Sequence, residues 1–171
     1  MTVHRLTPLP KATARGHLVV PIVVASRTMA LIGERGGNVG HEALVWWLGR
    51  QIGEDTIVVA SVAPAVDNGP QHVFADEVAV GEAAALARSH RLGIVAQVHS
   101  HPGGDTRHSD GDDILVLMPF EGMFSVVVAD YGSKGITPLG GAGLHQFQDG
   151  RWVWVTDAAR AMVFVPDELR R

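Results

Sequence analysis

Residues 94–112 read IVAQVHSHPGGDTRHSDGD, and this stretch decides the fold and the chemistry that we expect of the chain. The apolar run Ile94–His99 predicts a β-strand, and a polar, glycine-rich segment follows it. Side chains at positions i and i+2 of a strand point to the same face, so His99 and His101 can converge on one ion. Two unrelated surface histidines at a strand end remain the alternative interpretation of the pair.

The residue types in this stretch are typical of a metal site without sulfur. The chain has no cysteine and nine histidines, so any metal must be held by His, Asp or Glu. The lack of cysteine also excludes disulfide frameworks, thiol nucleophiles and zinc sites with CxxC spacing. Three protein ligands plus one water form the open arrangement of a catalytic zinc, which lowers the pKa of that water to about 7.

Ser109 and Asp112 follow the histidine pair after a short loop. A serine followed three residues later by an acidic residue is the pattern of a helix capping box, and a cap alone would explain it. The helix start could also aim Asp112 at the ion that His99 and His101 approach.

The whole string resembles the JAMM (Jab1/MPN/Mov34) metalloenzyme motif, which is His-x-His-Pro, six residues, Ser, two residues and Asp. The chain matches this motif without a gap at His99, His101, Pro102, Ser109 and Asp112. The resemblance implies that His99, His101 and Asp112 bind one zinc ion per chain. It also implies that Ser109 donates a hydrogen bond to the oxyanion that develops during hydrolysis.

The family also has a glutamate on an upstream strand. Residues 40–49 read GHEALVWWLG and resemble the family's Glu–apolar–Leu–x–Gly strand, which nominates Glu42 as the general base. By this resemblance Glu42 takes a proton from the attacking water and passes it to the leaving amine. Glu34 is the rival candidate, but it falls at the end of an expected helix. The bulky Trp46 and Trp47 stand where family strands carry small residues, which puts the shape of the substrate groove in question. Exposed tryptophans here would mark an interface, and burial within the hairpin explains them equally well.

The resemblance implies an α/β fold, with a mixed α+β sheet flanked by helices, of the JAB/MPN type, related in architecture to the cytidine-deaminase-like fold. The implied function is that of a zinc-dependent metallopeptidase. It would cleave an amide or isopeptide bond at the C-terminus of a ubiquitin-like or sulfur-carrier protein, or trim a small peptide. A non-catalytic MPN-type scaffold that binds a partner protein is the alternative. A zinc deaminase is excluded, because its PCxxC ligands need cysteine. The short segment 113–122 lacks room for the insertion that grips ubiquitin in linkage-specific family members.

Other polar residues around the motif compete as ligands. We interpret Asp105, His108, Asp110 and Asp113 as solvated or supporting groups, since zinc needs only three protein ligands here. His72 follows a turn-forming segment and is expected at the surface.

The chain pattern predicts an irregular arm over residues 1–16 and one domain over 17–171. With 171 residues and a net charge of −4, the composition is that of one globular domain without the basic excess of a nucleic-acid binder. No apolar run is long enough to span a membrane and no targeting signal is evident, so we expect a cytoplasmic protein. A homodimer is one of the assemblies open to it. The expected elements are a strand at 17–20, a helix from Pro21 to Gly36, hairpin strands at 42–48 and 56–62, a loop at 66–72, a helix from Asp76 to Gly93, and strands at 94–99, 124–129, 143–148 and 151–155. Val80, Ala84 and Ala87 form the expected apolar stripe of the second helix.

Overall fold

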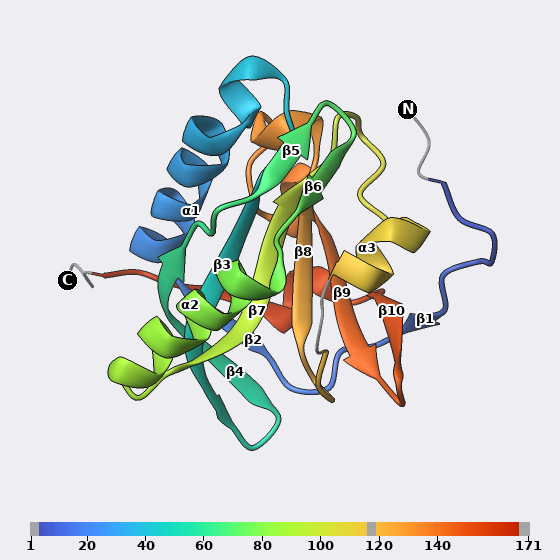
Figure 1. Ribbon diagram of the computed structural model, residues 1–171. Helices are drawn as coiled ribbons and strands as arrows, with labels where there is room; N and C mark the ends of the chain where they lie inside the picture. The colour runs from blue at the N-terminus through green and yellow to red at the C-terminus, as the bar shows by residue number, and fades with distance from the viewer. Residues whose placement is uncertain (1–3, 116–118, 168–171) are drawn as a thin grey trace.

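The computed structural model describes residues 4–115 and 119–167, so the ends of the expected arm and domain and part of the 113–122 segment lie outside the described residues. Its centre is a curled mixed sheet of nine strands in the order β1-β10-β9-β8-β7-β3-β4-β2-β11, and a separate two-stranded sheet pairs β5 with β6 (Figure 1). The sheet and its covering helices confirm the expected mixed α+β class. The strands are β1 (Lys11–Ala12), β2 (Leu18–Pro21), β3 (Leu44–Ile52), β4 (Asp55–Val62), β5 (Asp67–Gly69), β6 (His72–Phe74), β7 (Gly93–Ser100), β8 (Phe124–Val128), β9 (Gly143–Gln148), β10 (Arg151–Val155) and β11 (Met162–Val165). The helices are α1 (Ile22–Arg35), α2 (Glu77–Ser89), α3 (Asp110–Leu115) and α4 (Ala158–Ala161), with short 3-10 turns at Gly37–Val39, Asp130–Gly132 and Pro138–Gly140.

The two tryptophans of β3 show how the sheet separates α1 from α2. Successive side chains of a strand point to opposite faces. Trp47 therefore packs in the core beneath α1, where its indole Nε1–H donates to Thr28 Oγ1 at 2.7 Å. Trp46 packs on the other face against alanines of α2. Both indoles are buried, so neither is exposed as an interface residue or lines the cavity of the candidate site.

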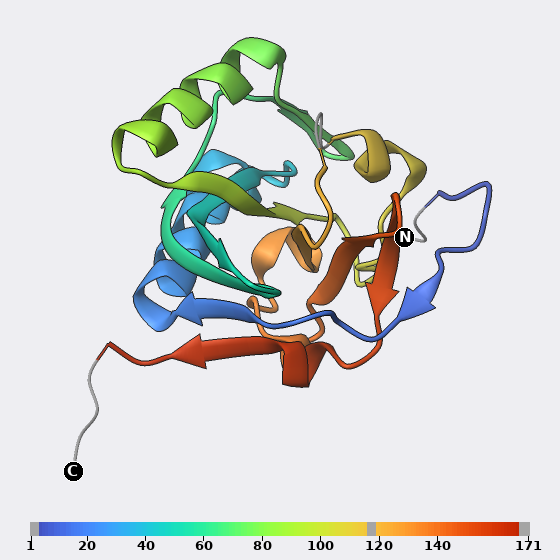
Figure 2. The same ribbon diagram turned by 90° about the horizontal axis from the view of Figure 1, so that it is seen from below.

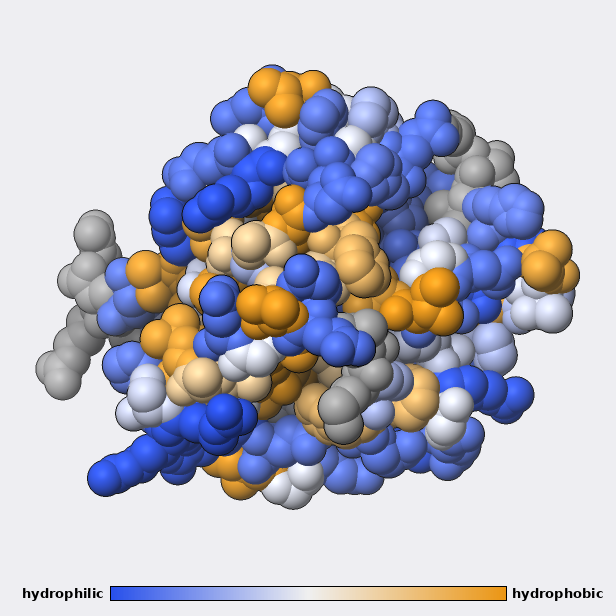
Figure 3. Space-filling view, in the orientation of Figure 1, coloured by the Kyte–Doolittle hydropathy of each residue, from blue (hydrophilic) through white to orange (hydrophobic). Residues whose placement is uncertain are grey.

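The β5–β6 hairpin and helix α3 frame the face of the sheet where the polar string from His99 to Asp112 lies. Strand β7 lies between β3 and β8, and its second half is fully buried. On one side of the β7 end stands the β5–β6 hairpin, and on the other side stands α3 (Figures 1 and 2). In the space-filling view this face is hollowed between polar rims, with apolar side chains gathered near its centre (Figure 3).

Three expectations about local structure are corrected. The segment 66–72, expected to be a loop, forms part of the β5–β6 hairpin, in which Asp67 pairs with Phe74. Strand β3 continues to Ile52, so the hairpin turn is much shorter than expected. On α2 the buried stripe is Ala79, Ala83 and Ala87, at i, i+4 spacing, so the expected stripe is confirmed at Ala87 and wrong at Val80 and Ala84. The small side chains of Ala79 and Ala83 pack in one cluster with Trp46, and Val80 packs partly buried at the edge of that cluster.

The arm and the C-terminal segment both join the sheet. Lys11–Ala12 pair in parallel with Trp154 and Val155 of β10, and β11 pairs in parallel with β2. The pairing of β11 with β2 is not evident from the sequence, because each strand is only four residues long.

Among the described residues, no helix has the length and apolar character needed to cross a membrane.

Alanine substitutions at two glycines are expected to have opposite effects on stability. Gly49 lies at a β-bulge, where a Cβ would clash with the carbonyl oxygen of Ile57. We therefore expect Gly49→Ala to lower the free energy of unfolding by about 1–3 kcal/mol. Gly81 lies within α2 with open space around its Cα, so Gly81→Ala should raise it by about 0.5–1 kcal/mol. Urea unfolding of the two variants measures both changes. A Gly49→Ala variant as stable as the wild type would contradict this account of the bulge, and a destabilised Gly81→Ala variant would contradict the open space in α2.

Candidate metal centre

The pairing of β3 with β7 brings Glu42 to His101, although the two are far apart in the sequence. Leu44 pairs with His99 in the antiparallel register, and the Ser100 N–H donates to the Ala43 carbonyl at 3.1 Å. Continuing this register places Glu42 opposite His101, and opposite residues of antiparallel strands share a face. The β5–β6 hairpin holds the backbone of Glu42, since the Glu42 N–H donates to the Gly69 carbonyl at 2.8 Å.

His99 and His101 converge as their spacing predicts. Their Nε2 atoms lie 3.2 Å apart, and their ring centroids lie 5.0 Å apart. The imidazole of His99 is completely buried and that of His101 is nearly so.

The first turn of α3 brings Asp112 to the same point. Ser109 Oγ accepts the Asp112 N–H at 3.0 Å, while Asp112 Oδ2 accepts the Ser109 N–H at 2.6 Å. This reciprocal pair is a complete capping box, as the sequence pattern predicts. Asp112 Oδ1 lies 3.3 Å from His99 Nε2, and Oδ2 lies 3.1 Å from His101 Nε2. One residue thus both caps the helix and faces the two imidazoles.

The chemistry of these three side chains fits a divalent metal ion. One ligand atom from each of His99, His101 and Asp112 lies within 4.8 Å of the others, and all three residues are buried. His101 Nδ1 lies 2.8 Å from the Asp105 carbonyl oxygen, which can only accept, so Nδ1 carries a proton. In neutral His101 the Nε2 lone pair then faces His99 and the Asp112 carboxylate. Such a cluster of electron-pair donors requires a cation or an added proton at its centre.

The electrostatics of these three side chains agree with this interpretation. Burial alone would raise the pKa of Asp112, but the facing imidazoles of His99 and His101 outweigh it and hold the pKa well below its usual range. Burial alone would lower the pKa of His101, yet the hydrogen bond and charge of Asp112 raise it. The carboxylate of Asp112 thus favours a positive charge between these side chains, which is the charge that a metal cation would supply.

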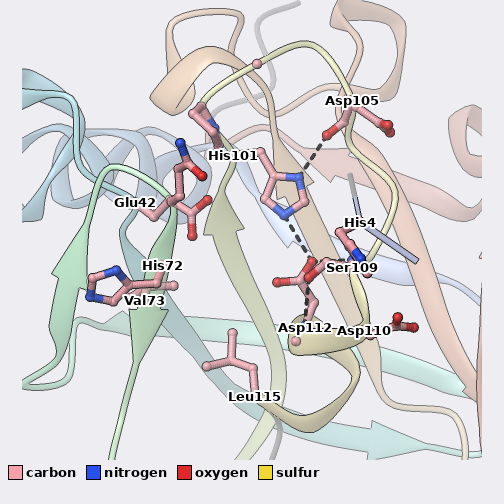
Figure 4. A pocket seen from close by; sticks show the side chains of 14 residues that line it. His4, Glu42, His72, Val73, His101, Asp105, Ser109, Asp110, Asp112 and Leu115 are labelled. Carbon is pink, nitrogen blue, oxygen red and sulfur yellow. Dashed lines mark hydrogen bonds and ion pairs between the residues drawn. The ribbon is translucent and has the colours of Figure 1, made fainter. Parts of the chain in front are cut away.

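Glu42 is a buried carboxylate with a strongly shifted pKa. Burial is the main cause that raises its pKa to about 7. The charge of His101 opposes this rise, and the charge of Asp112 adds to it. In Figure 4 its carboxylate points into the cavity from the side opposite Ser109 and Asp112, with His101 above them. The rival Glu34 lies on the exposed side of α1, where it pairs with Arg27 at 3.1 Å, so the structure does not bring it to the cluster.

The cavity between these groups has a volume of about 440 Å³. One wall comes from the β5–β6 hairpin through His72 and Val73, and the other comes from Ser109 and the start of α3. His72 is exposed, as expected, but it contributes to this wall.

The buried shell beneath the site is only partly evident from the sequence. His108 was expected to be a solvated or supporting group, and the structure buries it completely, with Nδ1 3.1 Å from Asp113 Oδ1 and Nε2 2.9 Å from Ser125 Oγ. His145 stacks on it with ring centroids 3.9 Å apart, and burial lowers the pKa of both imidazoles well below the ordinary value. Sequence reasoning missed Ser125 and His145, which lie on separate strands and carry no motif.

The raised pKa of Glu42 predicts a pH-dependent cost in stability. The unfolded chain loses this proton near 4.5 and the folded chain keeps it to about 7, so folded-state stability falls as pH rises through that window. Relative to Glu42→Gln, which cannot titrate, the metal-free wild type should lose about 3 kcal/mol between pH 4.5 and 7.5. Urea unfolding of both proteins at the two pH values gives the difference. If the wild type and Glu42→Gln differ in free energy of unfolding by the same amount at both pH values, Glu42 ionises at its ordinary pKa.

Comparison with known proteins agrees with the geometry. The family model for prokaryotic homologs of the JAB domain matches residues 24–135. A probable metalloprotease, y4jG of Sinorhizobium fredii (strain NBRC 101917 / NGR234), is 31% identical over 108 residues, which cover 57% of this chain and 62% of that protein. The chain thus matches less than two thirds of that relative's length.

Among solved structures, the solution structure of protein DSY2949 from Desulfitobacterium hafniense has a similar fold. It has a TM-score of 0.65 at 16% sequence identity, and the match covers 89% of this chain and 94% of that one. The family match includes Glu42, the β3–β7 pair and the whole string from His99 to Asp112. The chain therefore belongs to the family of prokaryotic homologs of the JAB domain.

Proposed function

We propose that the protein is a zinc-dependent metallopeptidase that hydrolyses an amide or isopeptide bond. The observation that carries this proposal is the convergence of His99, His101 and Asp112 opposite the buried carboxylate of Glu42. A zinc ion held by the first three residues would supply a Lewis acid that polarises the scissile carbonyl and lowers the pKa of a water molecule. The name of the y4jG relative, a probable metalloprotease, supports the same reaction class.

Glu42 acts as the general base and then as the general acid. A group that both accepts and donates a proton works best when its pKa is close to the operating pH. The burial of Glu42 raises its pKa to about 7, which suits this task. Glu42 takes a proton from the attacking water and delivers it to the leaving amine, so its carboxylate is ionised again at the end of the turnover.

Ser109 stabilises the oxyanion. Its Oγ accepts the Asp112 N–H in the capping box, which leaves the hydroxyl proton available for donation. Ser109 also lines the cavity, so this proton can be donated to an oxygen bound there. Loss of one such donor typically lowers the rate by about 100- to 1,000-fold.

The substrate that we propose is the extended C-terminal tail of a ubiquitin-like or sulfur-carrier protein, with a small peptide as the alternative. The β5–β6 sheet has only two strands, so β6 has an edge without a strand partner in the described part of the chain. His72 and Val73 of β6 also line the cavity. A tail added along β6 by main-chain hydrogen bonds would cross the face of the site. The non-catalytic scaffold is less favoured, because every position of the ligand set is filled.

The test is a hydrolysis assay on zinc-loaded protein. The substrates are ubiquitin-like fusions, lysine isopeptides, sulfur-carrier conjugates and dipeptides. We expect cleavage of at least one substrate, loss of cleavage on chelation, recovery with zinc, and no effect of a cysteine alkylating agent. Folded, zinc-loaded protein that leaves the whole panel intact would favour the scaffold, and cleavage that survives complete chelation would contradict the metallopeptidase.

A further inference from the structure

The N-terminal arm binds the loop that carries Ser109 and the start of α3. The Asp110 N–H donates to the His4 carbonyl at 3.1 Å, and the Leu6 N–H donates to Asp110 Oδ2 at 2.8 Å. These backbone contacts flank Arg5 on both sides, so residue 5 is fixed against the loop. His4 lines the cavity beside Ser109 and Asp110 (Figure 4).

The Arg5 side chain makes three contacts with this loop. Its Nη1 donates to the carbonyl oxygens of His108 at 2.9 Å and Ser109 at 3.2 Å. Its Nη2 donates to Asp113 Oδ2 at 2.9 Å. The side chain is only 13% exposed, so this is a held guanidinium and not a surface ion pair with free rotation. The planar guanidinium presents its donors in a fixed geometry, which suits three acceptors at once.

These contacts surround the proposed catalytic residues. The Ser109 carbonyl belongs to the residue that we propose as the oxyanion donor, and Asp113 directly follows the proposed ligand Asp112 in the chain. Asp113 uses its other oxygen, Oδ1, to bind His108 Nδ1 at 3.1 Å, and His108 Nε2 reaches Ser125 of β8 at 2.9 Å. Arg5 thus joins the arm to the first turn of α3, and through Asp113 and His108 it joins that turn to the central sheet.

We propose that Arg5 is a positioning residue of the metal centre, which clamps the loop so that Ser109 and Asp112 keep their orientation toward the cavity. This inference rests on the proposed function for its catalytic consequence, but the clamp itself is a property of the fold. The arm is then part of the site, because it holds the Ser109 loop and contributes His4 to the cavity wall.

The test compares Arg5→Met, Arg5→Lys and a matched control, Arg27→Met. Methionine keeps an unbranched, extended side chain but has no donor, and lysine keeps the charge without the planar set of donors. Arg27 forms an exposed ion pair with Glu34 on α1, away from the site. The readouts are hydrogen exchange of residues 107–115, zinc affinity, and kcat and KM on the substrate found in the hydrolysis assay.

We expect Arg5→Met to speed exchange of residues 107–115 while the β3 and β7 amides keep wild-type protection. Zinc affinity and kcat should each fall by about 10- to 100-fold, the usual effect of losing a group that orients metal ligands. Arg5→Lys should show the same local pattern to a smaller extent, and Arg27→Met should match the wild type in every readout.

Three results would overturn the proposal. The first is wild-type exchange in residues 107–115 of Arg5→Met. The second is faster local exchange with unchanged zinc affinity, since the clamp would then not position Asp112. The third is a uniform loss of protection throughout the chain in both Arg5 variants, which would mean general stability alone. Exchange needs neither zinc nor substrate, so a wild type that hydrolyses nothing would contradict the proposed function without contradicting the clamp.

Discussion

Replacing Glu42 by glutamine is expected to lower kcat by about 100-fold or more while the zinc content stays at the wild-type level. Glutamine has the same length and keeps hydrogen-bonding capacity, but it cannot accept the proton of the attacking water. The three side chains that we propose as ligands are untouched, so the ion should remain bound and KM should change little. Steady-state kinetics with elemental analysis of the same sample measures both quantities.

The matched control for this change is Glu34→Gln. Glu34 forms an exposed ion pair on α1, so its replacement should leave kcat and zinc content unchanged. An active Glu42→Gln variant would mean that the base lies elsewhere. Loss of zinc from Glu42→Gln would make Glu42 a ligand and the proposed division of roles wrong.

Replacing Asp112 by asparagine should have the second large effect, which is loss of metal and activity together. The amide removes the negative charge that faces His99 and His101, at 3.3 and 3.1 Å from their Nε2 atoms. We expect zinc affinity to fall by at least about 100-fold, and kcat at limiting zinc to fall with it. The amide oxygen can still accept the Ser109 N–H, so the helix cap and the fold should survive.

Asp76→Asn is the matched control for Asp112→Asn. Asp76 caps α2 by accepting the Ala79 N–H at 2.8 Å, and asparagine is an equally good cap. This variant should bind zinc like the wild type. If Asp112→Asn retains wild-type zinc affinity in a chelator competition, Asp112 is not a ligand.

The parts of the site that are close in sequence could be predicted from spacing alone. His99 and His101 converge because a strand alternates its faces, and Ser109 and Asp112 meet because a capping box closes over three residues. The spacing says nothing of Glu42, which needs the pairing of Leu44 with His99 to reach His101. Its nomination depended on the family resemblance, and the register supplies the physical reason.

Contacts made over long sequence distances could not be predicted in this way. Arg5 and Ser109 are separated by 104 positions, and no periodicity connects an irregular arm to a loop. The β5–β6 hairpin was missed because its Asp, Asn, Gly and Pro residues are typical of a loop, and its place beside the site shows only in the fold. Local patterns thus predict the ligand cluster, whereas the walls of the cavity depend on tertiary contacts.

We propose that His99, His101 and Asp112 hold one zinc ion on which hydrolysis depends. X-ray absorption at the zinc edge of stoichiometrically loaded protein tests it most directly, because imidazole rings give a distinct scattering pattern that can be counted for each zinc. We expect one zinc per chain with two imidazoles and otherwise oxygen ligands, and loss of that signal in Asp112→Asn. A folded protein that binds no zinc, or a bound zinc without two imidazoles, would contradict it.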